Sequence, residues 1–192
     1  MKFTLLFSGL LAAAIPTAIF AELPRDGKSI ALKDAVILVI RHAEKPANGR
    51  DLSAEGRARA KAYVDYFKNF KIDGQPLNLD YLFAAADSKE SHRSILTITP
   101  TSKTLGLAID SRFESNQFQK LADEIRARPH GNHILICWHH GDIPQLVQAL
   151  GANSGQLFPK AQWPDAVFDW VIQLRYDSDG RLVEAKRINE KF

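Results

Sequence analysis

Two clusters of arginine and histidine follow apolar runs of the sequence, and their side chains can bind or attack a phosphoryl group. The first cluster is Arg41-His42, directly after the apolar run 35–40. A guanidinium offers a planar fork of N–H donors that matches phosphate oxygens. A neutral imidazole offers a nitrogen that can attack phosphorus. The alternative for the same residues is a solvated loop start with a structural histidine.

The second cluster is His139-His140, after the apolar run 133–138, and Arg93 lies at a third such junction. Adjacent histidines could act as a proton-transfer pair, a phosphate clamp or metal ligands. Metal ligation is disfavoured because neighbouring side chains of a continuing strand point apart. Fixed positive donors stabilise the charge on a transferred phosphoryl group. Two arginines and two histidines at one edge therefore suit phosphoryl transfer.

The elements that position these residues alternate between strands and helices. Apolar runs predict strands over 35–40, 81–86, 107–110, 133–138, 167–176 and 181–188. Helical patterns predict a first helix that is capped by Ser53 and faces the core with Ala60, Tyr63, Val64 and Phe67. Three further helices are predicted over 91–105, 117–126 and 143–150. Pro100 is expected to kink or split the helix over 91–105. This order predicts an α/β fold, a three-layer α/β/α sandwich around a mainly parallel sheet. Such sheets bind ligands beyond the carboxyl ends of their strands, where both clusters lie.

Taken in order, these motifs resemble the histidine phosphatases, also called the phosphoglycerate-mutase-like superfamily. Residues 36–45 (VILVIRHAEK) resemble the family's first strand and its Arg-His-Ala-Glu motif, and residues 52–60 (LSAEGRARA) its Leu-Thr-x-x-Gly segment. Residues 88–97 resemble the segment with the second arginine, and residues 134–151 the second-histidine segment. The resemblance implies a phosphoglycerate-mutase-like fold. It also implies a phosphomonoesterase that forms a phosphohistidine and needs no metal or organic cofactor.

The resemblance implies a role for each matching residue. His42 would be the nucleophile, and Arg41 and Arg93 would bind phosphate. The family's His-Gly register gives the second catalytic role to His140 and leaves His139 as a substrate-binding partner. Relatives that carry Trp-Glu-His before a similar Ile-Pro pair agree with this assignment, whereas counting back from Ile143 in other relatives reverses the two roles.

The leaving alcohol needs a proton donor, and a well-placed acid accelerates this step by roughly 100- to 10,000-fold. In this branch of the family the donor usually follows the second arginine, so the resemblance favours Glu114. Asp110 and Asp142 are the alternatives for this role. His130 and His133 are interpreted as structural.

Two other functions fit the same clusters. A phosphomutase would move phosphate within a small molecule, although an export signal argues against it because the glycolytic mutases of the family are cytoplasmic. The second is a phosphate- or phospholigand-binding protein of the same fold, which would keep the pocket but not turn over a substrate. It is considered because the sequence offers several candidates for the proton donor and does not single one out.

The first 21 residues resemble a secretory signal peptide. Lys2 gives a positive start, an apolar stretch fills 3–20, and Ala21 is a small residue before the predicted cut. This pattern predicts a periplasmic or secreted protein with one domain over 22–192; the alternative is a retained membrane anchor. No later stretch is apolar over the roughly 20 residues that a span requires, so no membrane span is expected after cleavage.

The charge and the cysteine content exclude other classes of protein. The formal charge is only +3, and the basic residues are spread along the chain, which argues against a nucleic-acid partner. The expected partner is a small phosphorylated substrate. Cys137 is the single cysteine, so no internal disulfide can form, and its apolar neighbours predict a core residue.

Overall fold

The computed structural model describes residues 30–192 of the chain. The predicted signal peptide over 1–21 lies outside this part. Six strands form one sheet: β1 (Val36–Arg41), β4 (Tyr81–Ala84), β5 (Ile109–Asp110), β6 (His133–Trp138), β7 (Trp170–Tyr176) and β8 (Leu182–Asn189). The helices are α1 (Ala54–Lys68), α2 (Arg93–Leu105), α3 (Phe118–Ala127), α4 (Ile143–Ala149) and α5 (Ser154–Leu157), and β2 (Lys71–Ile72) with β3 (Gln75–Pro76) forms a separate small hairpin.

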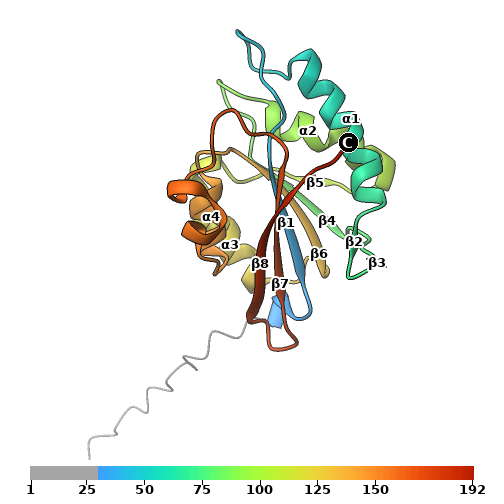
Figure 1. Ribbon diagram of the computed structural model, residues 1–192, viewed down its shortest axis with the longest axis vertical. Helices are drawn as coiled ribbons and strands as arrows, with labels where there is room; N and C mark the ends of the chain where they lie inside the picture. Colours follow the sequence, from blue (N-terminus) through green and yellow to red (C-terminus); the bar gives the residue numbers. More distant parts are fainter. Residues whose placement is uncertain (1–29) are drawn as a thin grey trace, which may run out of the picture.

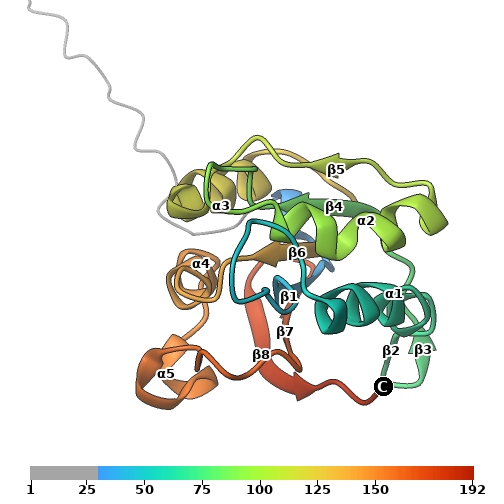
Figure 2. The same ribbon diagram turned by 90° about the horizontal axis from the view of Figure 1, so that it is seen from above.

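The sheet has the strand order β5-β4-β6-β1-β7-β8. Strands β5, β4, β6 and β1 pair in parallel, whereas β7 runs antiparallel to both β1 and β8. Figures 1 and 2 show α1 and α2 on one face of the sheet and α3 and α4 on the other. The predicted three-layer α/β/α sandwich with a mainly parallel sheet is therefore confirmed.

Strand β1 is buried on both faces, which explains its unbroken apolar sequence. Its alternate side chains enter two different cores. Leu38 and Ile40 pack in a core that includes side chains of α1 and α2. Ile37 and Val39 pack on the other side in a core that includes side chains of α3 and α4. Burial of this strand fixes where its last residue, Arg41, leaves the sheet.

The register between β1 and β6 determines which residues meet at the edge of the sheet. Arg41 lies opposite Trp138, and the backbone N–H of His42 donates to the Trp138 carbonyl at 2.9 Å. His42 and His139 therefore follow their strands side by side. Two segments that are about 100 residues apart in the sequence deliver their histidines to one place.

Helix α1 begins against the loop that follows His42. The Ser53 hydroxyl accepts a hydrogen bond from the Gly56 N–H at 3.1 Å, which confirms the predicted N-cap. The Ser53 N–H donates to the Glu44 carbonyl at 2.9 Å. A Cβ atom at Gly56 would lie 2.3 Å from that same carbonyl oxygen, so the helix can approach this closely only with glycine.

Several elements differ from the sequence prediction in extent. Helix α2 runs through Pro100 without being split, since the missing N–H removes a single helical bond while buried Ile98 and Thr101 hold the helix to the core. Val64 is only partly buried, unlike the other three side chains expected to face the core from α1. Strand β7 begins at Trp170 because residues 163–169 form a loop instead. No helix within residues 30–192 has the length and apolar character to cross a membrane.

We predict that Gly56→Ala destabilises the protein by about 1–3 kcal/mol, because the added methyl group would collide with the Glu44 carbonyl. Denaturant unfolding of the variant and the wild type measures the difference. Gly141→Ala is a matched control, since a Cβ atom there meets nothing within 4 Å. Equal stability of the two variants would contradict the close contact between α1 and the loop.

Candidate active site

The carboxyl ends of β1 and β6 and the start of α2 bring all five predicted arginines and histidines to one edge of the sheet. The ring centroids of His42 and His139 are 5.2 Å apart, and those of His42 and His140 are 6.3 Å apart. The Arg41 guanidinium lies 3.3 Å from a ring nitrogen of His140. The charge of Arg93 acts on both His42 and His139 and lowers their pKa values. The sequence clusters thus form one site.

The imidazole of His42 is buried and neutral. Only 3% of the residue is exposed, and its Nδ1 lies 2.7 Å from the Ala43 carbonyl oxygen. Because a carbonyl only accepts, Nδ1 carries the proton and Nε2 keeps its lone pair. Burial lowers the pKa of His42 to about 3, helped by the nearby positive charges of Arg41 and Arg93. His42 therefore offers a free nitrogen nucleophile at neutral pH.

Thr97 fixes the backbone that orients His42. Its hydroxyl accepts a hydrogen bond from the Ala43 N–H at 2.8 Å and donates to the Arg93 carbonyl at 2.7 Å. The threonine is fully buried, so these bonds do not compete with water. One side chain thereby connects the loop of His42 to the first turn of α2, which carries Arg93.

Arg41 is held by the loop over residues 163–169. Its Nη1 donates to the carbonyl oxygens of Pro164 (3.3 Å), Asp165 (2.9 Å) and Val167 (2.6 Å). The guanidinium carbon also lies 3.8 Å from the centre of the Phe168 ring. Burial lowers the pKa of Arg41 to about 10, which leaves the group charged at neutral pH.

Both arginines keep an N–H donor that has no acceptor in the part of the chain that the structure describes. The buried Nε atoms of Arg41 and Arg93 form no hydrogen bond. Arg93 is otherwise positioned by its Nη1, which lies 3.4 Å from the carbonyls of Arg50 and Glu90. Buried donors without partners are rare in proteins, and here two of them belong to the arginines that surround the buried His42. A phosphate oxygen is the kind of acceptor that they fit.

His139 and His140 are placed differently. Arg41 can only donate, so His140 Nδ1 accepts its Nη2–H at 3.3 Å, and His140 Nε2 donates to the Asp165 carboxylate at 2.7 Å. Both nitrogens of His140 are thus engaged. The ring of His139 forms no hydrogen bond within residues 30–192 and lines a cleft. Burial lowers the pKa of both histidines.

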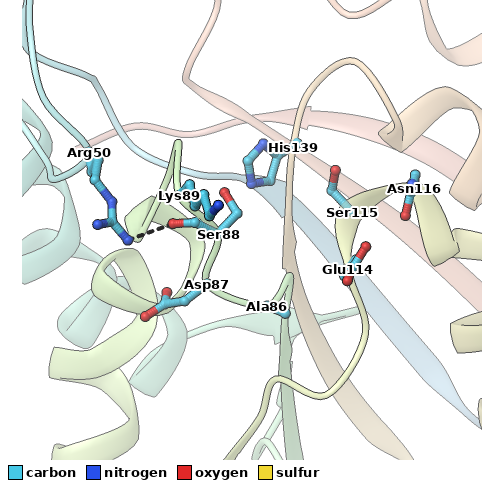
Figure 3. Close-up of a pocket in the computed structure, with 9 residues that line it drawn as sticks. All are labelled: Arg50, Ala86, Asp87, Ser88, Lys89, Glu114, Ser115, Asn116 and His139. Atoms are coloured by element: carbon cyan, nitrogen blue, oxygen red, sulfur yellow. Dashed lines mark hydrogen bonds between the residues drawn. The ribbon is translucent and has the colours of Figure 1, made fainter.

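The cleft beside His139 has a volume of about 620 Å³. Its walls come from three parts of the chain, Arg50, residues 86–89 and residues 114–116. Figure 3 shows Glu114 across the cleft from Arg50 and His139 between them. Glu114 is exposed and forms no ion pair in the described part of the chain.

The other two carboxylates proposed from the sequence lie outside the residues that line this cleft. Asp110 is bound by the Nε of Arg112 at 3.2 and 3.0 Å and by the hydroxyl of Tyr81 at 3.3 Å. Asp142 precedes α4, and its charge raises the pKa of His139. Of the three candidates, Glu114 is the one that faces the cleft.

His130, His133 and the cysteine are in structural positions. His133 begins β6, at the far end of that strand from the site, and its Nδ1 lies 2.7 Å from the Asn78 carbonyl. His130 packs against the rings of Tyr81 and Phe83. Cys137 is buried, and burial raises the pKa of its thiol. Among residues 30–192, no three histidine, cysteine or carboxylate side chains are grouped to hold a metal ion.

Comparison with known proteins identifies the fold. No family model and no curated protein matches the chain. Among solved structures, a candidate phosphohistidine phosphatase SixA from Agrobacterium tumefaciens superposes with a TM-score of 0.52 at 14% identity, over 79% of this chain and 97% of that one. A phosphoserine phosphatase variant from Entamoeba histolytica in complex with phosphoserine gives 0.53 at 10% identity, over 79% and 96%. A candidate alpha-ribazole-5'-P phosphatase from Escherichia coli gives 0.51 at 13%, over 82% and 97%.

These similarities show the fold alone: the chain shares the fold of these phosphatase structures, in agreement with the phosphoglycerate-mutase-like fold that its motifs predicted. The predicted nucleophile and arginines lie at the carboxyl edge of that fold. The loop over 163–169 is the part of the site that sequence reasoning missed. The sequence pattern predicted a strand from residue 167 onward, and nothing in it indicated that main-chain carbonyls would bind Arg41.

We predict that His42 remains neutral down to about pH 4, with the proton on Nδ1, as nitrogen NMR of the imidazoles can measure. The folded pKa of about 3 lies below the ordinary value of 6.5. The contribution of His42 to stability is therefore complete above pH ~6.5 and declines as the pH falls toward ~3. Comparing the pH dependence of unfolding between wild type and His42→Gln isolates this contribution. Titration of His42 near pH ~6.5 would contradict the buried, neutral state.

Proposed function

We propose that the chain is a phosphatase that hydrolyses phosphomonoesters through a phosphohistidine on His42. One observation carries this proposal. The free Nε2 of a buried, neutral His42 lies in a site where Arg41 and Arg93 each retain a buried N–H donor without an acceptor. A nucleophile beside two fixed cationic donors suits transfer of an anionic phosphoryl group. The fold and the sequence motifs support the same conclusion.

The proposed reaction has two steps. In the first, the Nε2 lone pair of His42 forms a bond to phosphorus while the bond from phosphorus to the leaving oxygen breaks. The leaving oxygen takes a proton from Glu114. In the second, Glu114 accepts a proton from water, the water oxygen bonds to phosphorus, and the bond to His42 breaks to release phosphate. Arg41 and Arg93 stabilise the negative charge on the phosphoryl oxygens in both transfers.

We assign the second histidine of the phosphate pocket to His139. The register of the sequence favours His140, but both nitrogens of that ring are already bonded to Arg41 and Asp165. His139 is also nearer to His42 and has no competing partner within residues 30–192. His140 then acts as a positioning residue that holds Arg41.

We also propose that the enzyme needs no metal ion and is exported to the periplasm or beyond the cell. Metal independence is supported by the two arginines, which supply the positive charge that a metal would otherwise bring. Export is supported by the sequence of residues 1–21 alone. Fractionation of the cells followed by determination of the first residue tests it: protein in the periplasm or medium that starts near Glu22 agrees with export and cleavage, whereas cytoplasmic protein that retains Met1 opposes export.

We predict that the protein from Glu22 onward hydrolyses para-nitrophenyl phosphate in the presence of a chelator. His42→Ala should lower kcat/KM by at least about 1,000-fold, since it removes the nucleophile. His139→Ala should lower it by about 100- to 1,000-fold through loss of a pocket donor. His140→Ala should have a smaller effect, because Arg41 keeps its three carbonyl partners. Phosphate release measures each rate.

His133→Ala is the matched control, because this histidine lies at the far end of β6 and should leave the rate within about threefold of wild type. Hydrolysis that survives in His42→Ala would contradict the mechanism. Hydrolysis that requires an added metal would contradict metal independence. Phosphate-dependent thermal stabilisation without turnover of any ester would instead indicate a protein that binds phosphate only.

A further inference from the structure

The cleft beside His139 carries two cations that the proposed phosphoryl transfer does not use. Arg50 and Lys89 line the same wall, and neither forms an ion pair in the described part of the chain. Figure 3 shows both on the side of the cleft that faces Glu114. His139, whose ring lies 5.2 Å from that of His42, also lines this cleft, so the two cations lie on a side of the site into which the remainder of a substrate can extend.

Hydrogen bonds hold the residues of this wall in a defined conformation. The Nη2 of Arg50 donates to the Ser88 carbonyl at 2.6 Å, which fixes one side of the guanidinium, and its other N–H groups have no acceptor within residues 30–192. Ser88 also closes a tight turn, because its hydroxyl accepts from the N–H groups of Glu90 and Ser91 at 3.1 Å each. Lys89 sits within this turn. The guanidinium of Arg50 and the backbone at Lys89 are thus held in place before a ligand binds, which reduces the entropy cost of binding.

Neither acidic residue of the cleft forms an ion pair with Arg50 or Lys89 in the described part of the chain. Asp87 pairs with the Nδ1 of His92 at 2.6 Å. Glu114 stands on the opposite wall, where the proton donor is needed. Ala86 is the single apolar side chain among the residues that line the cleft, so an apolar leaving group would find no matching surface.

We propose that the leaving group of the substrate is small and polar and carries a second anionic group, which Arg50 and Lys89 bind. The anion is a carboxylate or a second phosphate, since a guanidinium and an ammonium recognise both. A cleft of about 620 Å³ has the size of a small-molecule site. This inference rests on the proposed phosphatase activity and identifies the substrate class of the same site.

The test compares three aryl esters that share a phenyl phosphate core and differ in the para substituent, which supplies the second charge. These are phenyl phosphate, para-carboxyphenyl phosphate and para-phenylene bisphosphate. Wild type should favour a doubly charged ester over phenyl phosphate by about 5- to 20-fold in kcat/KM, and the ratio should fall as salt is added because these charges are exposed. The carboxylated ester and the bisphosphate are then compared by kcat/KM, after the value for the bisphosphate is halved for its two equivalent phosphates. The ester with the higher kcat/KM identifies the anion that the cleft prefers.

Arg50→Met combined with Lys89→Met should bring this ratio close to one. Lys103→Met is the matched control: it removes an exposed charge from the last turn of α2, outside the cleft, and should keep the wild-type ratio. A wild-type ratio near one, or an unchanged ratio in the double variant, would overturn the second anion site while turnover of phenyl phosphate still supports the phosphatase. If wild type hydrolyses none of the esters, the proposed function fails and this inference fails with it.

Discussion

The hydrogen bond between His42 Nδ1 and the Ala43 carbonyl determines what the rest of the site can do. It places the proton on one ring nitrogen and leaves the other free, and burial keeps the ring from gaining a second proton. A histidine exposed to water would be partly protonated near neutral pH and would lose its nucleophilic nitrogen. The surrounding elements keep this ring buried and neutral and fix its orientation.

Three contacts hold the backbone around that bond. Pairing with β6 fixes His42 through the Trp138 carbonyl, Thr97 binds the Ala43 N–H, and Ser53 binds the Glu44 carbonyl at the start of α1. Each contact comes from a different element, and each partner lies in a motif that the sequence displays. The spacing of those motifs therefore reflects a geometric requirement, since moving any one element would change the direction of the imidazole.

Local patterns in the sequence predicted the central part of the fold well. The run HILICW coincides with β6, and Ser53 caps α1, because an apolar run and a capping residue act through their immediate neighbours. The relative roles of His139 and His140 were not predictable in this way. They depend on Asp165, which reaches His140 across 25 residues of sequence, and on the carbonyls that bind Arg41. Main-chain oxygen atoms carry no sequence signature, so such contacts become visible only in three dimensions.

The most direct test of the account is to identify the phosphorylated residue during turnover. The protein is mixed with para-nitrophenyl phosphate, quenched in alkali, and analysed by mass spectrometry and phosphorus NMR. The account predicts an acid-labile phosphate on His42, attached through Nε2, because Nδ1 is committed to Ala43. Hydrolysis that proceeds without this adduct, or a phosphate found on another residue or on Nδ1, would contradict it.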